Sequence, residues 1–465
     1  MNYVNGKVEN IKIAYIGGGS KCWAWGLMSD LANASDISGD VYLYDIDHEA
    51  AQKNEIIGNM YKDAEGANSV WNYHAVKEAG EALTGADFVV ISILPGTFDE
   101  MESDVHTPEK YGIYQAVGDT TGPGGIVRAM RTIPMYEEIA ENIKKYCPEA
   151  WVINYTNPMT LCVKTLYRVF PEIKAFGCCH EVFGTQKFLA MVAEKELGIE
   201  GIKREDIKIN PVAVNHFTWI TEATYKNIDL YPYYAKFCRE HKDGFLEEGF
   251  TEGGWLNKFF ENKKKVAIDL FNKFGVIAAA GDRHLAEFCP GNWYLESLER
   301  VNEMCFGLTP VSWRKNTFMK GRIERSDKLL SGEEKVEIAL TGEEGVDQIR
   351  ALLGLHEMTT NINIPNIGQI PNLPLGAIVE TNAILRSGTM HPVFAGEIPQ
   401  AVYPMVSRIC GEQEALSQAM AERDVEKIFV AFANDPLVTC GVEKAREMFN
   451  EMCENTKEYL TSYNL

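Results

Sequence analysis

The hydrophobic residues in the first 180 positions occur in short runs that alternate with longer segments of mixed polarity. The runs have the length of buried strands, and the mixed segments have the length of helices. We predict strands at 11–16, 41–44, 87–93, 151–154 and 173–177, and helices up to Leu31, at 49–64 and at 134–145. Strands that alternate with helices are typical of a parallel sheet with right-handed crossovers. The pattern therefore predicts an N-terminal Rossmann-like α/β domain over residues 9–180, with helices on both faces.

The alternation ends near residue 180, and no repeat, low-complexity segment or flexible linker follows. Helices are predicted at 186–197, 255–274, 294–305, 414–432 and 440–460, and a Pro/Asn-rich segment at 361–374 interrupts a further strand–helix region. We therefore predict a C-terminal α+β domain over residues 181–465 that packs on the first domain. This domain is expected to carry substrate binding and oligomerisation, in an overall plan similar to that of the lactate and malate dehydrogenases.

The first predicted strand ends in a Gly-Gly-Gly-Ser turn at 17–20. Glycines let the backbone approach a pyrophosphate, and the start of the next helix offers free N–H groups. The usual G-x-G-x-x-G fingerprint is matched only in part, because position 22 is Cys. An acidic residue at the end of the second strand can bind a ribose hydroxyl and favours NAD over NADP. The order of these features predicts an NAD site, where a plain tight turn is the alternative; its residues would be Gly17, Gly19, Ser20 and Asp45.

Asn154 and Asn157 lie where the strand at 151–154 ends, near the expected reactive end of the cofactor. We expect Asn154 to line the cofactor site. Asn157 stands before Pro158 and is either a turn signal or an amide that orients a sugar hydroxyl.

Cys179 and His180 follow the last predicted strand of the first domain, and His216 stands in a Val-Asn-His-Phe segment further on. A thiolate and an imidazole at strand ends can hold one divalent metal ion. A buried free thiol and satisfied polar histidines are the ordinary alternatives. The spacing alone leaves both interpretations open.

Asp282, Arg283 and His284 come directly after a run of small residues that permits close approach of backbone or ligand. An ordinary solvated loop is the alternative for this cluster.

Composition narrows the class of partner. The net charge of −21, from 45 basic and 66 acidic residues, argues against binding of a nucleic-acid backbone. Eleven cysteines are too few for a disulfide scaffold, so reduced thiols and a cytoplasmic location are expected. The first ten residues lack the apolar core of a signal peptide, and no run of about 18 apolar residues is present to span a membrane. These features predict a cytoplasmic protein that acts on a small molecule.

Several motifs in the same order resemble family 4 of the glycoside hydrolases, the NAD- and metal-dependent glycosidases. The resemblance extends over most of the chain. It is carried by the turn at 17–20, Asn157-Pro158, Cys179-His180-Glu181-Val182, Asn215-His216-Phe217 and the segment 361–366. Within that family the Cys-His-Glu-Val form resembles the α-galacturonidases, and some α-glucosidases begin with the same Cys-His-Glu.

The resemblance implies residue roles. It implies Mn²⁺, or another divalent ion, held by Cys179 and His216, substrate binding by Asn157 and proton donation by His180. Asp282 aligns with a base proposed in α-glucosidase members, whereas the Tyr base of other members has no clear counterpart. The chemistry of a uronide adds an arginine for its carboxylate, for which we favour Arg283, with Arg128 and Arg131 as alternatives.

The implied reaction is hydrolysis of an α-galacturonide without net redox change. NAD⁺ would accept a hydride from C3, a base would remove the C2 proton, the glycosidic bond would break by elimination, and water would add before the hydride returns. The resemblance also implies a homodimer or homotetramer. An α-glucosidase, α-galactosidase or α-glucuronidase of the same family is the nearest alternative. More distant alternatives are a 2-hydroxy-acid dehydrogenase, which would release net NADH, and a nucleotide-sensing module, which would not turn over a glycoside.

Overall fold

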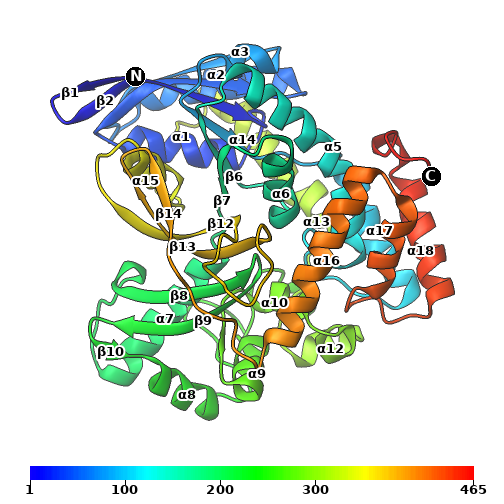
Figure 1. Ribbon diagram of the computed structural model, residues 1–465. Coiled ribbons are helices and arrows are strands. Elements are labelled where there is room, and N and C mark those ends of the chain that lie inside the picture. The colour runs from blue at the N-terminus through cyan, green and yellow to red at the C-terminus, as the bar shows by residue number, and fades with distance from the viewer.

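The computed structural model describes residues 1–465 (Figure 1). Its larger sheet has a parallel core in the spatial order β4-β3-β2-β5-β6-β7. This order places the switch in direction between β2 and β5, as in Rossmann folds, and confirms the predicted architecture. The strands are β2 (Lys7–Ile16), β3 (Ile37–Tyr44), β4 (Trp71–Val76), β5 (Phe88–Ile91), β6 (Trp151–Asn154) and β7 (Lys174–Gly177); a short β1 (Asn2–Val4) pairs with β2.

Helices cover both faces of this sheet, because the strands are apolar on both sides. Residues of α1 and α2 share one buried cluster with one face, whereas residues of α3, α5 and α6 share another with the opposite face. The helices are α1 (Trp23–Asn33), α2 (His48–Met60), α3 (Ala79–Leu83), α4 (Phe98–His106), α5 (Gly122–Tyr146) and α6 (Met159–Val169). The helix predicted from 134 in fact begins twelve residues earlier, at Gly122, and Pro134 lies inside it.

The larger sheet continues into the second half of the chain. Strand β12 (Met358–Pro365) pairs antiparallel with β7, and Asn363 lies opposite Gly177. Strands β13 (Ile378–Arg386) and β14 (Thr389–Pro392) extend the same sheet further. The domain boundary expected at residue 180 stays a prediction, but the hydrogen-bonded sheet crosses it.

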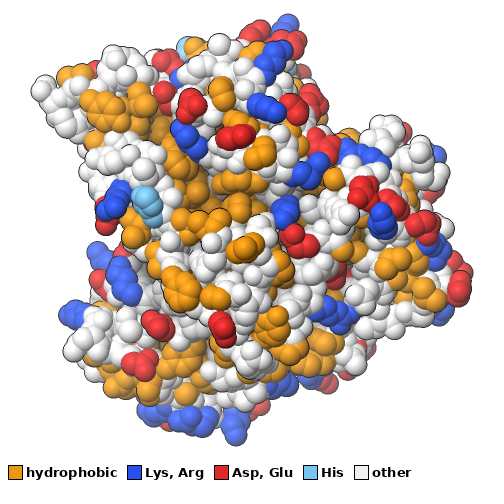
Figure 2. Space-filling view, viewed as in Figure 1, with side chains coloured by type: hydrophobic (Ala, Val, Ile, Leu, Met, Phe, Trp, Pro, Cys, Tyr) orange, Lys and Arg blue, Asp and Glu red, His pale blue; other side chains and the backbone are white.

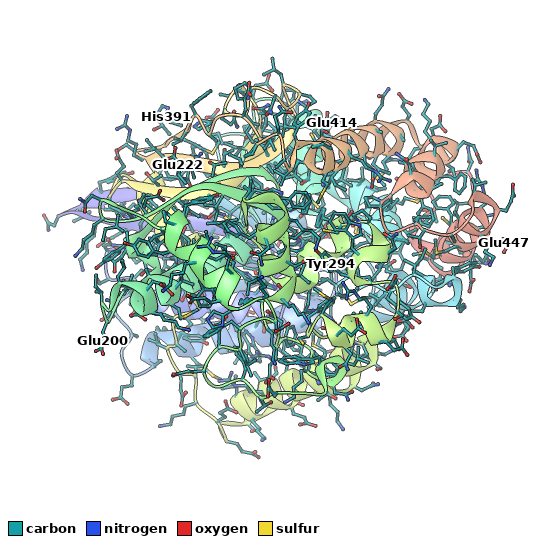
Figure 3. The ribbon with its side chains drawn as sticks, turned by 90° about the horizontal axis from the view of Figure 1, so that it is seen from below. Glu200, Glu222, Tyr294, His391, Glu414 and Glu447 are labelled. Carbon is teal, nitrogen blue, oxygen red and sulfur yellow. The ribbon has the colours of Figure 1, made fainter.

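A second, antiparallel sheet follows α7 (Glu181–Leu197). It contains β8 (Ile207–Val214), β9 (Phe217–Tyr225), β10 (Ile228–Asp229) and β11 (Ile277–Ala278). The amide of Asn382 on β13 donates to the carbonyl of Ile209 on β8 at 2.7 Å and joins the two sheets. Seen from below, Glu222 on β9 and His391 on β14 lie on the same side of the molecule, and Tyr294 lies nearer its middle (Figure 3).

Short helices surround this second sheet. The predicted helix 255–274 is helical only at its two ends, and the predicted helix 294–305 is likewise broken. These helices are α8 (Tyr231–Glu240), η4 (Trp255–Asn257), α9 (Lys265–Phe274), α10 (Asp282–Phe288), α11 (Gly291–Tyr294) and α12 (Leu298–Glu303). The chain then returns to the N-terminal part: α13 (Val311–Trp313) contacts α4, the π-helix η5 (Arg314–Met319) leads into α14 (Lys320–Ser331), which contacts α2, and α15 (Gly345–Leu352) contacts α1 and β13.

Three C-terminal helices, α16 (Tyr403–Glu422), α17 (Val425–Asn434) and α18 (Val442–Asn455), pack beside α5 (Figure 1). The single helix predicted at 414–432 is therefore two. Arg423 ends α16 with a left-handed φ of 58°, and the Asp424 carboxylate accepts the Lys427 N–H to cap α17. The largest buried cluster combines residues of these helices with residues of α5. Among all the helices, none combines the length and apolar character needed to cross a bilayer.

Candidate active site

The glycine turn lies at the carboxyl end of β2, beside the switch between β2 and β5. Gly17 has a left-handed φ of 95°, and a Cβ there would lie 2.0 Å from the carbonyl oxygen of Ser92. A Cβ on Gly18 would lie 2.7 Å from Leu43. Only glycine therefore allows the backbone to pass this closely between neighbouring strands. The same absence of side chains leaves a backbone surface that a pyrophosphate can approach.

Asp45 and Ser20 complete the turn. One Asp45 oxygen accepts the Gly19 N–H at 2.8 Å and the other accepts the Asp47 N–H at 2.9 Å, and burial raises the pKa of the carboxyl. Each oxygen keeps a second lone pair for a ribose hydroxyl. The Ser20 hydroxyl accepts the Trp23 N–H at 3.2 Å at the start of α1. These contacts fit a dinucleotide at the predicted position.

Asn154 and Asn157 have different surroundings. Asn154 is fully buried, and its amide bonds to Tyr136, to Thr156 and to the sulfur of Met159. The structure thus gives Asn154 an internal role at the end of β6 in place of the predicted contact with the cofactor. The Asn157 amide instead donates to Asp119 at 3.3 Å, and its carbonyl oxygen Oδ1 is buried without a partner. A buried oxygen without a donor suits a ligand hydroxyl.

His216 lies at the tight connection between β8 and β9, with a left-handed φ of 65°. Its Nδ1 meets the Thr120 hydroxyl oxygen at 3.0 Å, and that hydroxyl donates to Asp119 at 2.7 Å. Since the hydroxyl proton goes to Asp119, Nδ1 of His216 is the donor, and its Nε2 keeps a free lone pair. Burial, followed by the neighbouring His284, lowers the pKa of His216 to about 3 and keeps the ring neutral.

His284 stands against His216, with ring centroids 3.9 Å apart. One ligand atom from each of Asp119, His216 and His284 lies within 4.8 Å of the other two. Burial opposes the charge of Asp119, but His216, His284 and Arg128 outweigh it and hold the pKa of this carboxyl below its usual range. A carboxylate and two imidazoles at this spacing can bind a divalent cation.

Cys179 lies at the end of β7, and its thiol is beside the Asn215 amide, next in sequence to His216. The three-residue cluster does not include this thiol. Burial raises the pKa of Cys179 well above its ordinary value, so it needs a cation to become a thiolate. Both amide atoms of the buried Asn215 lack hydrogen-bond partners. Asn215 thus connects the two residues of the predicted metal pair, and the pair stays a prediction.

His180 begins α7 with its side chain half exposed. Its Nδ1 meets the Glu343 carboxylate at 3.1 Å, and this hydrogen bond raises the pKa of the imidazole. Its ring also tilts toward Trp23, with centroids 6.1 Å apart. A histidine that carries a proton at the edge of the site fits the predicted role as proton donor.

Asp282 does not point to this cluster. Its two oxygens accept the N–H groups of Val266 and Ala267 at 3.2 and 3.1 Å, at the start of α9. Its side chain is fully buried, and burial raises its pKa to about 6. The structure thus gives Asp282 a helix-capping role in place of the predicted role as base.

The three candidate arginines differ in what they contact. Arg131 is fully buried and ion-paired with Asp104, so it cannot reach a substrate. Arg128 donates its Nε to the Asn157 carbonyl at 3.1 Å. Arg283 donates Nη2 to Ala116 at 2.7 Å and to Thr309 at 2.5 Å. Of the three arginines, Arg283 directly precedes His284, which belongs to the cluster with Asp119 and His216.

Asp119, Thr120 and Glu181 were missed as site residues by sequence reasoning. Glu181 accepts the Gly281 N–H at 2.7 Å and lies 3.5 Å from Nε2 of His284. The Asp-Thr-Thr-Gly-Pro-Gly-Gly run at 119–125 is a signal that could have identified the loop, because it marks a buried helix start with close backbone approach.

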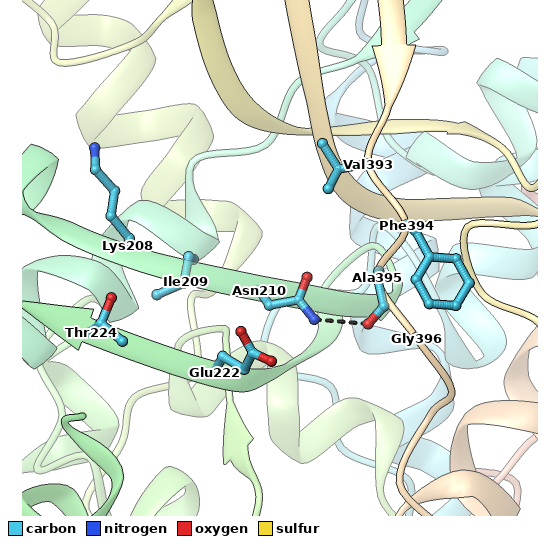
Figure 4. A pocket seen from close by; sticks show the side chains of 9 residues that line it. All are labelled: Lys208, Ile209, Asn210, Glu222, Thr224, Val393, Phe394, Ala395 and Gly396. Carbon is cyan, nitrogen blue, oxygen red and sulfur yellow. Dashed lines mark hydrogen bonds between the residues drawn. The ribbon is translucent and has the colours of Figure 1, made fainter. Parts of the chain in front are cut away.

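A separate hollow lies away from these residues. It has a volume of about 420 Å³ and is lined by β8, β9 and the segment 393–396 (Figure 4). Asn210 crosses it and donates to the Ala395 carbonyl at 2.8 Å. None of the predicted site residues lines this hollow.

Comparison with known proteins gives one consistent result. Residues 12–195 match the family model described as Family 4 glycosyl hydrolase, and residues 212–438 match that of its C-terminal domain. The chain is 57% identical, over 100% of both chains, to a protein of Thermoanaerobacterium saccharolyticum named Alpha-galacturonidase.

Solved structures agree. The Bacillus subtilis protein lplD has a TM-score of 0.90 and 49% identity, covering 96% of this chain and all of its own. A 6-phospho-alpha-glucosidase from gut microorganisms, solved with NAD and Mn²⁺, has a TM-score of 0.77 and 20% identity over 97% of this chain and 99% of its own. This second likeness shows the fold.

Proposed function

The chain belongs to family 4 of the glycosyl hydrolases, and we propose that it hydrolyses α-galacturonides with NAD⁺ and a divalent metal ion, Mn²⁺ by preference. The observation that carries the substrate is the 57% identity over the full length of a protein named Alpha-galacturonidase. The site supports the chemistry, since a carboxylate and two imidazoles each place a ligand atom within 4.8 Å of the others, and burial keeps His216 neutral. The nearest alternative substrates are α-glucosides, α-galactosides and α-glucuronides.

The residues present fit both groups. NAD would lie along Gly17, Gly19 and Ser20, with Asp45 at the ribose, because a Cβ would fill this cradle. The metal ion would be held by Cys179 and His216, and the orphaned amide of Asn215 beside them marks a place for a ligand. When bound, NAD⁺ supplies a reversible hydride acceptor and the metal ion a Lewis acid.

The side chains then have distinct tasks. Asn157 binds a sugar hydroxyl through its free Oδ1, and the Thr120 hydroxyl fixes the ring of His216. His180, protonated beside Glu343, gives its proton to the departing glycosidic oxygen. Arg283 binds the uronide carboxylate.

Release of p-nitrophenol from the α-galacturonide, under reducing conditions, tests this proposal. We expect release that needs both NAD⁺ and Mn²⁺ and leaves no net NADH. Release of p-nitrophenol from the α-galactoside instead would assign a different substrate of the same family. No release from the folded, cofactor-loaded protein, or accumulation of NADH with turnover, would contradict the proposal.

We also propose that the protein forms a homodimer or homotetramer in the cytoplasm. Three large apolar side chains, Ile367, Leu375 and Phe394, are 73%, 76% and 69% exposed. The loops that carry them are joined by the Ala395 N–H, which donates to Gln369, and by the Asn366 amide, which donates to Pro374. Figure 2 shows hydrophobic side chains gathered across the middle of one face.

Free thiols throughout the chain support a reducing compartment, as expected of the cytoplasm.

A further inference from the structure

Arg314 is an unpaired guanidinium at the edge of the candidate site. It opens the π-helix η5, is half buried, and has neither a side-chain hydrogen bond nor an ion pair. None of its three side-chain nitrogens is fully enclosed, so each keeps some surface that a ligand can reach. A free arginine of this kind needs a reason in a chain with 66 acidic and 45 basic residues. π-helical turns are frequent at functional sites.

Aromatic packing links the segment that begins the π-helix to Arg283. The guanidinium of Arg283 lies 5.1 Å from the ring centre of Phe260, and Phe260 meets Trp313 edge-on with centroids 5.7 Å apart. Trp313 directly precedes Arg314. Burial, followed by the charge of Arg314, lowers the pKa of Arg283 to about 10, as expected of two cations near each other.

The neighbouring carboxylates do not neutralise this pair. Asp119 is occupied by Thr120 and Asn157, and Glu287 accepts the N–H groups of Val117 and Gly118 at 2.7 and 3.0 Å. Neither lies within 4.0 Å of a guanidinium nitrogen of Arg283 or Arg314 as an ion pair. Two guanidinium groups on linked segments, neither of them ion-paired with a carboxylate, can together bind an external anion.

We propose that Arg314 is the specificity-determining residue for the uronide, and that it binds the substrate carboxylate together with Arg283. This inference rests on the proposed function. Arg283 directly precedes His284, whose ring contacts His216, and both guanidinium groups are close enough to this cluster to feel the charge of Asp119. In this proposal, a pyranose held at the cluster by its ring hydroxyls turns its carboxylate toward these two guanidinium groups. Thr309, bonded to Arg283, fixes the angle of that guanidinium.

The test compares two substrates that differ only in this carboxylate, p-nitrophenyl α-galacturonide and p-nitrophenyl α-galactoside, on the protein loaded with NAD⁺ and Mn²⁺. We expect Arg314→Gln to lower kcat/KM for the galacturonide by roughly 10- to 100-fold, mainly through KM, as for loss of a charge-assisted hydrogen bond. Turnover of the galactoside should not fall. Arg314→Lys, which keeps charge without the planar fork, should lie between Gln and wild type.

Lys315→Gln is the matched control, because the neighbouring Lys315 pairs with Asp99 on the surface. It should behave as wild type. An equal loss for both substrates, or an unchanged KM for the galacturonide in Arg314→Gln, would refute the role of Arg314.

Calorimetric binding of free galacturonate and galactose separates this inference from the proposed function. If the wild type fails to hydrolyse the galacturonide but binds galacturonate, and Arg314→Gln weakens that binding at least roughly tenfold, the proposed function fails and the anion site stands. Equal binding to both proteins, or no binding of galacturonate to the wild type, would overturn the anion site. Arg314→Lys provides the same comparison if the Gln variant does not fold.

Discussion

Single residues in this site are governed by burial and by the charges beside them. Burial raises the pKa of Cys179 and lowers that of His216, which leaves both uncharged without a cation. Burial also opposes the charge of Glu181, but His284, His216 and His180 outweigh it and lower its pKa to about 2. The site therefore keeps its carboxylates ionised and its ligand imidazole neutral, which are the forms that a metal ion requires.

Burial of Glu287 should make the free energy of unfolding depend on pH. Its pKa rises from an ordinary 4.5 to about 7 because the carboxyl is buried, and Oε2 has no partner. A raised pKa in the folded state means that stability is fully present below about 4.5 and is lost as pH rises through about 7. Glu287→Gln cannot ionise and keeps an acceptor for Val117 and Gly118.

We therefore expect the wild type to lose about 3 kcal/mol relative to Glu287→Gln between pH 4.5 and 7. Denaturant unfolding across this pH range measures the difference. The exposed Glu200, changed to Gln, is the control for loss of one negative charge. Parallel stability curves for the wild type and Glu287→Gln would contradict a buried, titrating Glu287.

Residues of the site were predicted where a local motif carries the chemistry. Cys179, His180 and Asn157 follow predicted strands within three residues, so the parallel topology places them at the same edge of the sheet, and their roles stay predictions. Asp119 and Arg314 were not predicted, because they reach the site from a buried loop and a π-helix whose positions depend on tertiary packing.

At the scale of elements, the strands of the parallel core are the best predicted part. Strand β5 is a continuous apolar run of four buried residues, and β2 ends in a buried run that leads into the glycine turn, so both have the pattern of buried parallel strands. The start of α5 was missed because Gly122 and Pro123 read as a loop, whereas its buried environment makes the helix. The strands β8 and β9 were also missed, since Pro211 stands inside β8 beside a register shift and both strands lack a regular alternation of buried and exposed residues.

The turn between β2 and α1 gives the test at this scale. Gly17→Ala would place a Cβ 2.0 Å from the Ser92 carbonyl oxygen at a φ of 95°. We expect thermal unfolding several degrees lower and NAD⁺ binding weakened at least roughly tenfold, because β2 and β5 must separate. Calorimetric titration with NAD⁺ and thermal unfolding measure the two effects.

Gly184→Ala is the matched control for this change. Gly184 lies exposed in α7, and a Cβ there meets nothing within 4 Å. It should bind NAD⁺ as wild type and gain up to about 1 kcal/mol, since alanine favours helix. Similar NAD⁺ affinities for Gly17→Ala and Gly184→Ala would contradict NAD⁺ binding at this turn.

Across the whole molecule, the two halves of the chain form one hydrogen-bonded structure. Strand β12 joins the N-terminal sheet, and Asp435, from the C-terminal helices, accepts the Gly122 N–H at 2.9 Å at the start of α5. The loop before that helix carries Asp119 and Thr120, so the C-terminal helices help to hold the cluster in place. The sequence could not predict this, because the partners are more than 300 positions apart.

The exposed apolar side chains on the loops at 366–376 and 393–396 are the surface at which we expect copies of the chain to associate. Exposed apolar groups that adjoin one another mark a contact surface. In a symmetric interface each substitution acts twice, so Phe394→Ser should raise the dissociation constant of the assembly at least roughly tenfold. Sedimentation over a range of concentrations should show wild-type dimers or tetramers and a shift of Phe394→Ser toward monomer. Val430→Ser removes a similarly exposed side chain on α17 and should leave the assembly unchanged, whereas a wild type that stays monomeric would exclude this interface.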